Sequence, residues 1–265
     1  MSTSQAAARP VRADAAPAHR NPGFPLELDW VRDVRVNRSA VERRAGTIGT
    51  RRTVKKEWQA AWLVKAVTCI DLTTLAGDDT KGRVERLCAK ARRPVRQDIL
   101  EALGVAHLDI RVASVCVYHA LVATAREALE GSGVPVAVVS AGFPAGLSPL
   151  RQRIDEVAAS ASAGADEIDV VINRANVLEG RWGALYEEVR AFRGAAGNAR
   201  LKVILATGDL GTLTNIAAAS RIAMLAGADF IKTSTGKEGV NATMPFALVM
   251  ARMIREYFAR LYATD

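Results

Sequence analysis

The sequence has little cysteine, little histidine and no long apolar run, and each shortage argues against a class of protein. Its three cysteines are widely spaced and include no C-x-x-C pair, so we expect reduced thiols in a cytoplasmic protein. The three histidines lie far apart in the sequence, so we expect no metal site. No apolar run reaches the roughly 18 residues that a membrane helix needs, so no membrane partner is expected.

Positive charge is concentrated near the N-terminus. The net charge is +8, but residues 1–60 hold 12 Lys/Arg against 6 Asp/Glu, and the remaining residues hold 24 against 22. No zinc-finger, RRM or homeodomain pattern accompanies this basic segment, so we expect no nucleic-acid partner. Residues 1–24 are expected to form a disordered basic tail, although a faint likeness to an organelle transit peptide leaves that alternative open.

Short strand patterns alternate with helical patterns from about residue 67 onward. Before them, residues 37–60 form one or two expected helices, in which Trp58 and Trp62 are four apart and are expected to dock on the body. The expected strands are residues 67–72, 113–118, 136–141, 167–172, 201–206 and 229–233. The expected helices are residues 80–92, 119–131, 149–163, 182–195, 213–226 and 245–263. This alternation predicts parallel strands with right-handed crossovers.

Six strand–helix units fit either an open doubly wound sheet or an incomplete barrel, because a complete eight-stranded barrel typically takes about 250 residues. Polar residues recur on one face of nearly every strand, since alternate strand residues share a face. Lys and Asp are rarely buried without partners, so this pattern favours a barrel with a polar interior site. The residues expected to converge there are Asp71, Cys116, Asp169, Lys202 and Lys232.

The segment 230–237, Phe-Ile-Lys-Thr-Ser-Thr-Gly-Lys, carries the most informative chemistry. A lysine that ends an apolar strand is poised to lose its proton, because burial and a neighbouring cation both favour the neutral amine. A neutral amine can attack an aldehyde and form an imine. The turn that follows offers hydroxyl and N–H groups to a phosphate. Taken alone, the run also fits a snorkelling lysine at a strand end.

Other motifs accompany this segment in a fixed order. They are Asp71-Leu72-Thr73-Thr74-Leu75, Val115-Cys116-Val117-Tyr118, Gly142-Phe143-Pro144-Ala145-Gly146, Gly164-Ala165-Asp166-Glu167-Ile168-Asp169-Val170-Val171, Leu201-Lys202-Val203-Ile204, and Val240-Asn241-Ala242-Thr243 after residues 230–237. From about residue 21 to residue 258 the chain resembles the 2-deoxyribose-5-phosphate aldolase family. Residues 51–58 resemble its animal-type branch.

The resemblance implies a role for each residue of the expected site. Lys232 would be the Schiff-base lysine, and Asp169 would handle protons at the carbinolamine and the C3 hydroxyl. Asp71 and Thr73 would position the substrate hydroxyls, Cys116 would line the pocket, and Lys202 would be a nearby cation. The 5-phosphate would be held by Thr235, Gly236 and Lys237.

The resemblance also implies a TIM-type β/α barrel and a reaction. The expected enzyme is a class I aldolase, an aldehyde-lyase of deoxynucleoside catabolism. It would cleave 2-deoxy-D-ribose 5-phosphate to D-glyceraldehyde 3-phosphate and acetaldehyde, without a metal or organic cofactor. Its expected partners are small phosphorylated sugars and aldehydes, and a homo-oligomer stays open.

One part of the family pattern is not found. After the position of Phe258 the family continues with a strand carrying Lys-Pro-Ala-Gly-Gly-Ile-Arg and an eighth strand with a Gly-Ala-Ser loop, and neither motif occurs here. We therefore expect one domain over residues 25–265, with a barrel from about residue 67 that lacks two strands. We also expect a marginal or aggregation-prone monomer, unless a partner chain covers the gap. The alternative function is a catalytically impaired paralogue that acts as a non-catalytic or partner-dependent protein.

Overall fold

A single sheet of six parallel strands forms the centre of the computed structural model, which describes residues 20–51 and 53–261. The strands are β1 (Asp71–Thr73), β2 (Ser114–Tyr118), β3 (Val136–Ser140), β4 (Glu167–Val171), β5 (Arg200–Ile204) and β6 (Phe230–Lys232). They lie in chain order, each beside its sequence neighbour. A doubly wound sheet would reverse its strand order at a switch point, so the order favours the barrel family.

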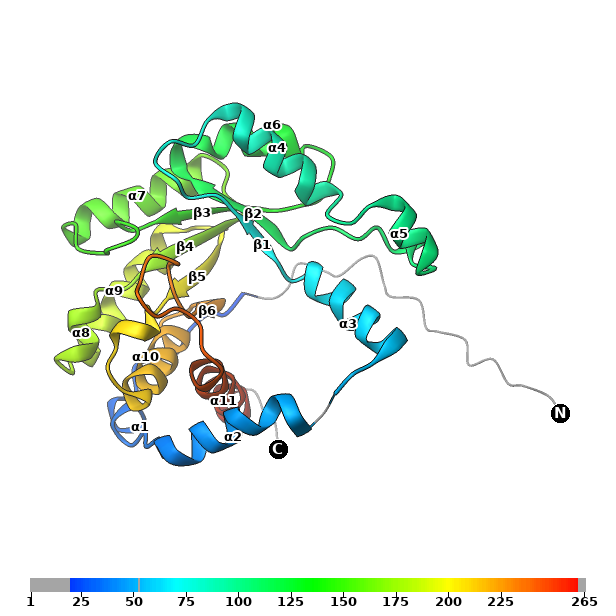
Figure 1. Cartoon of the computed structure of the whole chain (residues 1–265). Helices are drawn as coiled ribbons and strands as arrows, with labels where there is room; N and C mark the ends of the chain where they lie inside the picture. The colour runs from blue at the N-terminus through cyan, green and yellow to red at the C-terminus, as the bar shows by residue number, and fades with distance from the viewer. Residues whose placement is uncertain (1–19, 52, 262–265) are drawn as a thin grey trace.

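The chain alternates between these strands and helices. The helices after β1 are α4 (Lys81–Arg92), α5 (Gln97–Ala102), α6 (Val122–Leu129), α7 (Leu150–Ser162), α8 (Arg174–Leu178), α9 (Trp182–Ala195), α10 (Leu213–Leu225) and α11 (Met244–Leu261), with short 3₁₀ turns η1 (Ala106–Leu108), η2 (His119–Leu121) and η3 (Thr207–Asp209). Of these, α4, α6, α7, α9 and α10 pack on the strands and cover one face of the sheet. Neighbouring helices pack side by side, α4 on α6, α7 on α9, α9 on α10 and α10 on α11 (Figure 1). Among the described residues, no helix is long and apolar enough to cross a membrane.

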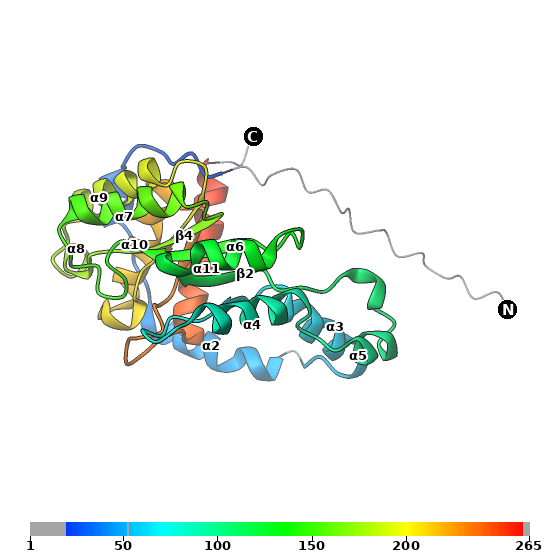
Figure 2. The same cartoon turned by 90° about the horizontal axis from the view of Figure 1, so that it is seen from above.

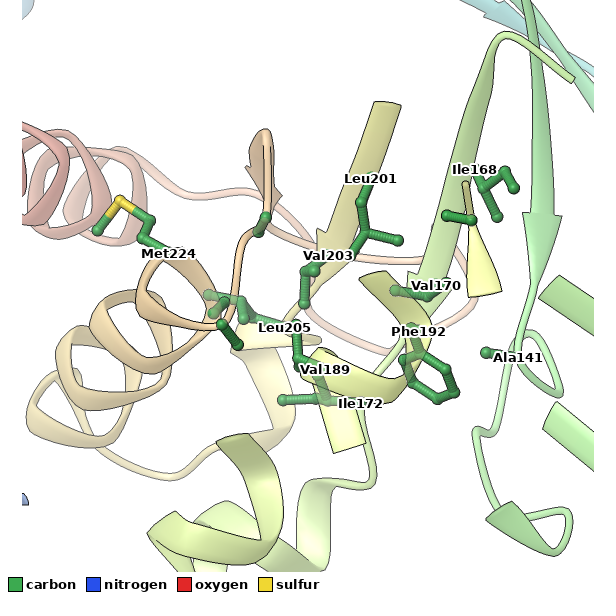
Figure 3. Packing of buried hydrophobic residues seen from close by; sticks show 14 of the residues in the cluster. Ala141, Ile168, Val170, Ile172, Val189, Phe192, Leu201, Val203, Leu205 and Met224 are labelled. Carbon is green, nitrogen blue, oxygen red and sulfur yellow. The ribbon is translucent and has the colours of Figure 1, made fainter. Parts of the chain in front are cut away.

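The apolar side of each strand faces the helices, because alternate residues point to opposite faces. Val170, Leu201 and Val203 are fully buried on that side. Figure 3 shows Val189 and Phe192 of α9 beside strand residues of this core. The opposite, inner face carries the polar residues. The predicted alternation of strand and helix is therefore confirmed, and the charged residues of the strands share the inner face with apolar ones such as Ala137 and Val139.

Within the described residues β1 and β6 do not pair with each other, so the sheet is a partial barrel, as expected. The first strand begins later than predicted. Helix α3 (Lys56–Val67) runs into the residues expected to start β1, and a turn at residues 68–70 precedes the strand. The prediction of a strand from residue 67 is wrong, because the apolar residues on which it was based lie at the end of helix α3.

The N-terminal helices differ in how they pack. Helix α1 (Leu28–Arg32) contacts α10, and α2 (Arg38–Arg51) packs on α11. By contrast, no residue of the fully described helix α3 is buried, and Trp58 and Trp62 are 67% and 61% exposed. Figures 1 and 2 place α3 on the side of the molecule away from α7–α9. The expectation that these tryptophans dock the helix on the body is wrong.

The segment before α1 lies against the body. The Asn21 N–H donates to Asp229, and the Asn21 side-chain amide donates to the carbonyls of Met224 and Ala228. The Phe24 N–H donates to the carbonyl of Leu225. Residues 20–24 were expected to belong to a disordered tail, but they make these defined contacts; the rest of that expected tail, residues 1–19, lies outside the described residues.

Candidate active site

The strand register brings the polar residues of the inner face together. Asp71 lies opposite Ser114, Asp169 opposite Lys202, and Ile204 opposite Lys232. Because these strands are parallel and in register, side chains from β1, β4, β5 and β6 meet on one surface. The expected convergence of Asp71, Cys116, Asp169, Lys202 and Lys232 on one face is confirmed as a matter of geometry.

Lys232 and Asp169 form the centre of the cluster. Lys232 Nζ lies 2.6 Å from Asp169 Oδ2, and the Asp169 side chain is fully buried whereas that of Lys232 is 32% exposed. Burial by itself lowers the pKa of Lys232, but the charge of Asp169 and its hydrogen bond outweigh burial and raise that pKa above its ordinary value. The expectation that burial and a neighbouring cation leave Lys232 poised to lose its proton is therefore wrong for this arrangement, because the Asp169 carboxylate favours the charged form.

Lys202 is held by carboxylates from two other strands. Its Nζ lies 2.5 Å from Asp71 Oδ2 and 2.6 Å from Glu167 Oε2, and 3.9 Å from Asp169 Oδ1. Burial lowers the pKa of Lys202, but the charges of Asp169, Glu167 and Asp71 together raise it well above its usual range. Lys202 is thus a permanent cation beside the Lys232–Asp169 pair.

Asp71 completes this arrangement from the first strand. Its Oδ1 accepts a hydrogen bond of 2.7 Å from the Ser114 hydroxyl. Burial would raise the pKa of Asp71, but the charge of Lys202 and the hydrogen bonds from Lys202 and Ser114 lower it below its usual value. Asp71 is therefore ionised and fixed in position at neutral pH.

Glu167 was not among the predicted site residues, although it contacts Lys202 directly. Its side chain is 6% exposed, as is that of Lys202. The signal that could have found it is its position, since Glu167 lies two residues before Asp169 and must share its face of β4. Glu167 is the first residue of β4, whereas the expected chemistry lies further along the strand. The sequence pattern gave a carboxylate at that position no role, so Glu167 was not selected.

Cys116 and Thr73 differ in their exposure to solvent. Cys116 is fully buried and packs with Ala137 and Val139 on the inner face. Burial, with the nearby charge of Asp169, raises the pKa of the Cys116 thiol to about 12, so this thiol is inert at neutral pH. Thr73 is exposed at the end of β1, and its hydroxyl donates to the Asp71 carbonyl at 2.8 Å.

In the turn after β6, two of the N–H groups that were predicted to bind a phosphate donate hydrogen bonds within the turn itself. The Thr235 N–H donates to the Glu238 carboxylate at 3.0 Å, and the Lys237 N–H donates to Thr235 Oγ1 at 3.1 Å. Gly236 has φ +85°, a conformation that favours glycine. The exposed side chain of Lys237 is therefore the charged group that this turn presents to solvent.

Two grooves lie elsewhere on the molecule. One, of about 980 Å³, is lined by Val136, Asp166 and Arg200 at the amino ends of β3–β5. The other, of about 600 Å³, runs between Phe230 and α11. Neither groove is lined by Asp169 or Lys232. The chemistry of the cluster, not groove size, identifies the site.

No group of three or more His, Cys, Asp or Glu side chains in the described part of the chain could hold a metal ion. What the cluster combines is an amine, a buried carboxylate and a second fixed cation. These are the groups that a lysine-based carbonyl chemistry needs.

Comparison with known proteins identifies the family. Residues 65–262 match the sequence model of the DeoC/LacD family aldolases. The chain belongs to this aldolase family. The chain is 59% identical to the human deoxyribose-phosphate aldolase over 240 residues, which are 90% of this chain and 76% of the human protein. The family assignment implied by the sequence motifs, including the animal-type branch, is confirmed.

Solved structures of aldolases share the fold. A candidate deoxyribose-phosphate aldolase from Coccidioides immitis superposes with a TM-score of 0.64 at 28% identity, covering 83% of this chain and 81% of that one. The tetrameric deoxyribose phosphate aldolase of Aeropyrum pernix superposes with a TM-score of 0.57 at 21% identity, covering 84% of this chain and 82% of that one. The six strands of this aldolase-family chain therefore correspond to part of the barrel found in these proteins.

Proposed function

We propose that the chain is a class I aldolase, a lyase that cleaves 2-deoxy-D-ribose 5-phosphate to D-glyceraldehyde 3-phosphate and acetaldehyde. The observation that carries the proposal is the 2.6 Å contact between Lys232 Nζ and Asp169 Oδ2 on the inner face of the sheet. An amine next to a buried carboxylate can both attack a carbonyl and pass on the proton that it releases. The likeness to the human deoxyribose-phosphate aldolase supports the choice of substrate.

In the proposed reaction, Lys232 first transfers its proton to Asp169, and the neutral amine then attacks C1 of the open-chain sugar. The hydroxyl of the resulting carbinolamine takes that proton back from Asp169 and leaves as water, which gives a protonated imine. Asp169 then takes the proton of the C3 hydroxyl, directly or through a water, while the C2–C3 bond breaks and its electrons move into the imine. Glyceraldehyde 3-phosphate leaves, the enamine takes a proton at C2, and hydrolysis of the imine releases acetaldehyde and the lysine.

The other residues have supporting roles in this proposal. Lys202, held as a cation by Asp71 and Glu167, offsets the negative charge around Asp169. Asp71 and Thr73 position the sugar hydroxyls from the end of β1, and Cys116 lines the site with a neutral thiol. For the 5-phosphate we propose the turn at Thr235 and Gly236, with the charge supplied by Lys237.

Borohydride trapping tests the proposal directly. The protein is incubated with acetaldehyde or with 2-deoxyribose 5-phosphate, reduced, and the adduct is mapped by peptide mass spectrometry. We expect one adduct on Lys232, its loss in Lys232→Ala, and its retention in Lys65→Ala, which removes an exposed lysine of α3. If folded protein gives no adduct on Lys232, the alternative of a catalytically impaired, non-catalytic protein replaces this one.

Three further expectations are part of the proposal. The reaction needs no metal or organic cofactor, because the lysine itself supplies the electron sink, so turnover is expected to survive EDTA. A homo-oligomer is expected, and light scattering of the purified chain tests it. The enzyme is expected to act in the cytoplasm, which cell fractionation tests.

A further inference from the structure

Arg174 connects four of the segments that follow strands. It is the first residue of α8, which begins three residues after the last residue of β4, and its side chain is 20% exposed. Its guanidinium donates to the carbonyl of Ala145 at 2.8 Å and, more weakly, to that of Pro144 at 3.4 Å, in the segment after β3. It also pairs with Asp209 after β5 at 2.9 Å and with Glu238 after β6 at 3.2 Å.

Glu238 passes this connection on to the turn proposed to bind the phosphate. Its side chain is only 2% exposed, and its two carboxylate oxygens lie 3.0 and 3.2 Å from the Thr235 nitrogen. The turn is thus tied at one end to β6 and at the other to Arg174. Buried charge-assisted hydrogen bonds of this kind are stronger and more directional than neutral ones.

The segments after β5 and β6 also touch through their backbones. A Cβ added to Gly208 would lie 2.0 Å from the carbonyl oxygen of Val240. Figure 1 shows the β6–α11 loop beside the segment that joins β5 to α10. The loop that carries the turn therefore packs closely on its neighbour, and Arg174 contacts both segments, through Glu238 and Asp209.

The Lys232–Asp169 pair depends on other interactions. Its residues lie within β4 and β6, which are both hydrogen-bonded to β5. Loss of the Arg174–Glu238 contact leaves these strand pairings in place and releases only the loop. The phosphate turn and the aldehyde chemistry can therefore be separated by mutation.

We propose that Arg174 and Glu238 are positioning residues that set the preference of the enzyme for phosphorylated over unphosphorylated substrates. Together they hold the Thr235–Lys237 turn in place before the substrate arrives, so phosphate binding does not have to order the loop. This inference rests on the proposed function and adds a determinant of its substrate class.

The test measures the substrate concentration that gives half-maximal borohydride-trapped adduct on Lys232, which requires no turnover. It is measured for 2-deoxyribose 5-phosphate and for unphosphorylated 2-deoxyribose. In Glu238→Gln and Arg174→Met we expect this concentration to rise about tenfold for the phosphate ester, the effect of losing one charged contact. For the unphosphorylated sugar we expect this concentration to change by no more than about twofold, because that sugar has no phosphate for the turn to bind. Arg181→Gln, which removes an exposed arginine paired with Glu179, is the matched control and should change neither value.

Each outcome decides the matter. A loss of preference for the ester in every variant that folds supports the inference. Equal weakening for both sugars, no change, or a stronger preference for the ester overturns it. Glu238→Gln keeps an oxygen acceptor for the Thr235 N–H, so it supplies a folded variant even if Arg174→Met does not fold. If the unmodified protein forms no adduct with acetaldehyde, the proposed function itself fails, which separates the two failures.

Discussion

Lys202 Nζ on the fifth strand lies 2.5 Å from Asp71 Oδ2 on the first. In a flat sheet, four strand spacings of about 4.8 Å would keep these two strands roughly 19 Å apart. The contact therefore requires a sheet that curls strongly about its inner face. One ion pair joins strands that share no backbone hydrogen bond in the described sheet, and it lies next to the proposed catalytic pair.

The Asp71–Lys202 contact is expected to stabilise the curled sheet. Asp71→Asn should lower the free energy of unfolding by about 1–3 kcal/mol, because it leaves a buried ammonium with one partner fewer. Urea denaturation at pH 7 measures the change in unfolding free energy. The control is Asp155→Asn, which removes one partner of the exposed Arg151–Asp155 pair and should change that free energy by less than about 0.5 kcal/mol.

The stabilising contribution of Asp71 is expected to depend on pH. The pKa of Asp71 is lowered in the fold, so its contribution is present above about pH 4 and is lost as the pH falls through the folded pKa. Asp71→Asn should therefore reduce the acid dependence of stability, and an unchanged dependence would contradict the assignment.

The protonation of Lys232 is expected to depend on Asp169. The carboxylate raises the pKa of Lys232 against the effect of burial, so Asp169→Asn should lower that pKa. The pH midpoint for trapping acetaldehyde on Lys232 should move to lower pH in the variant. Cleavage of the sugar phosphate should fall about a hundredfold or more, because the proton acceptor is lost. A midpoint that stays in place would mean that Asp169 does not control the amine.

Glu167 is expected to act on Lys202 rather than on the substrate. Glu167→Gln should cost about 1–3 kcal/mol of unfolding free energy, since a buried charged contact is weakened. A double-mutant cycle with Lys202→Met should give a coupling energy of about 1 kcal/mol or more. The exposed pair Arg151 and Asp155, treated in the same way, should give less than about 0.5 kcal/mol. Additive effects for Glu167 and Lys202 would show that their 2.6 Å contact has no energetic role.

The three cysteines should differ sharply in reactivity. Cys69 is exposed, whereas Cys88 and Cys116 are buried. Burial raises the pKa of Cys116 to about 12, so little thiolate is present at pH 8. Iodoacetamide at pH 8 should therefore alkylate Cys69 first, and the other two only after denaturation. Rapid labelling of Cys116 in the folded protein, read by mass spectrometry, would contradict the buried placement.

The exposed tryptophans of α3 should contribute little to the stability of the chain. Trp58→Ser and Trp62→Ser should each change the unfolding free energy by less than about 0.5 kcal/mol. Trp30 is the contrast, because its ring lies 4.3 Å from both the Arg221 and Arg260 guanidinium carbons. Trp30→Ala should cost about 2 kcal/mol or more. A large loss at Trp58 or Trp62 would mean that α3 docks in solution.

The face of each strand is predictable from the sequence, because the two-residue period of a strand is a local property. That period alone puts Asp169 and Lys202 on the inner face. Helix α9 (Trp182–Ala195) is predicted with its correct ends for a similar reason, since its apolar residues repeat at the helical period. The start of β1 is not predicted correctly, because the apolar pattern near residue 67 fits the end of a helix as well as the start of a strand.

Contacts between distant segments have no local signature. Nothing in the sequence near Arg174 indicates that it meets Pro144, Asp209 and Glu238. The exposure of Trp58 likewise depends on where the rest of the chain lies, since its spacing from Trp62 defines a face but not what covers it.

The sequence by itself determined the aldolase family, the alternating strands and helices, and the lysine and carboxylate of the proposed chemistry. These follow from residue order and from periods of two and 3.6 residues, which act over short stretches of chain. The tertiary structure alone decided that Asp169 raises the pKa of Lys232, that Glu167 belongs to the cluster, and that Arg174 holds three loops together. The physical reason is distance, because the pKa of a buried group and the strength of an ion pair depend on charges within a few ångströms, whatever their separation along the chain.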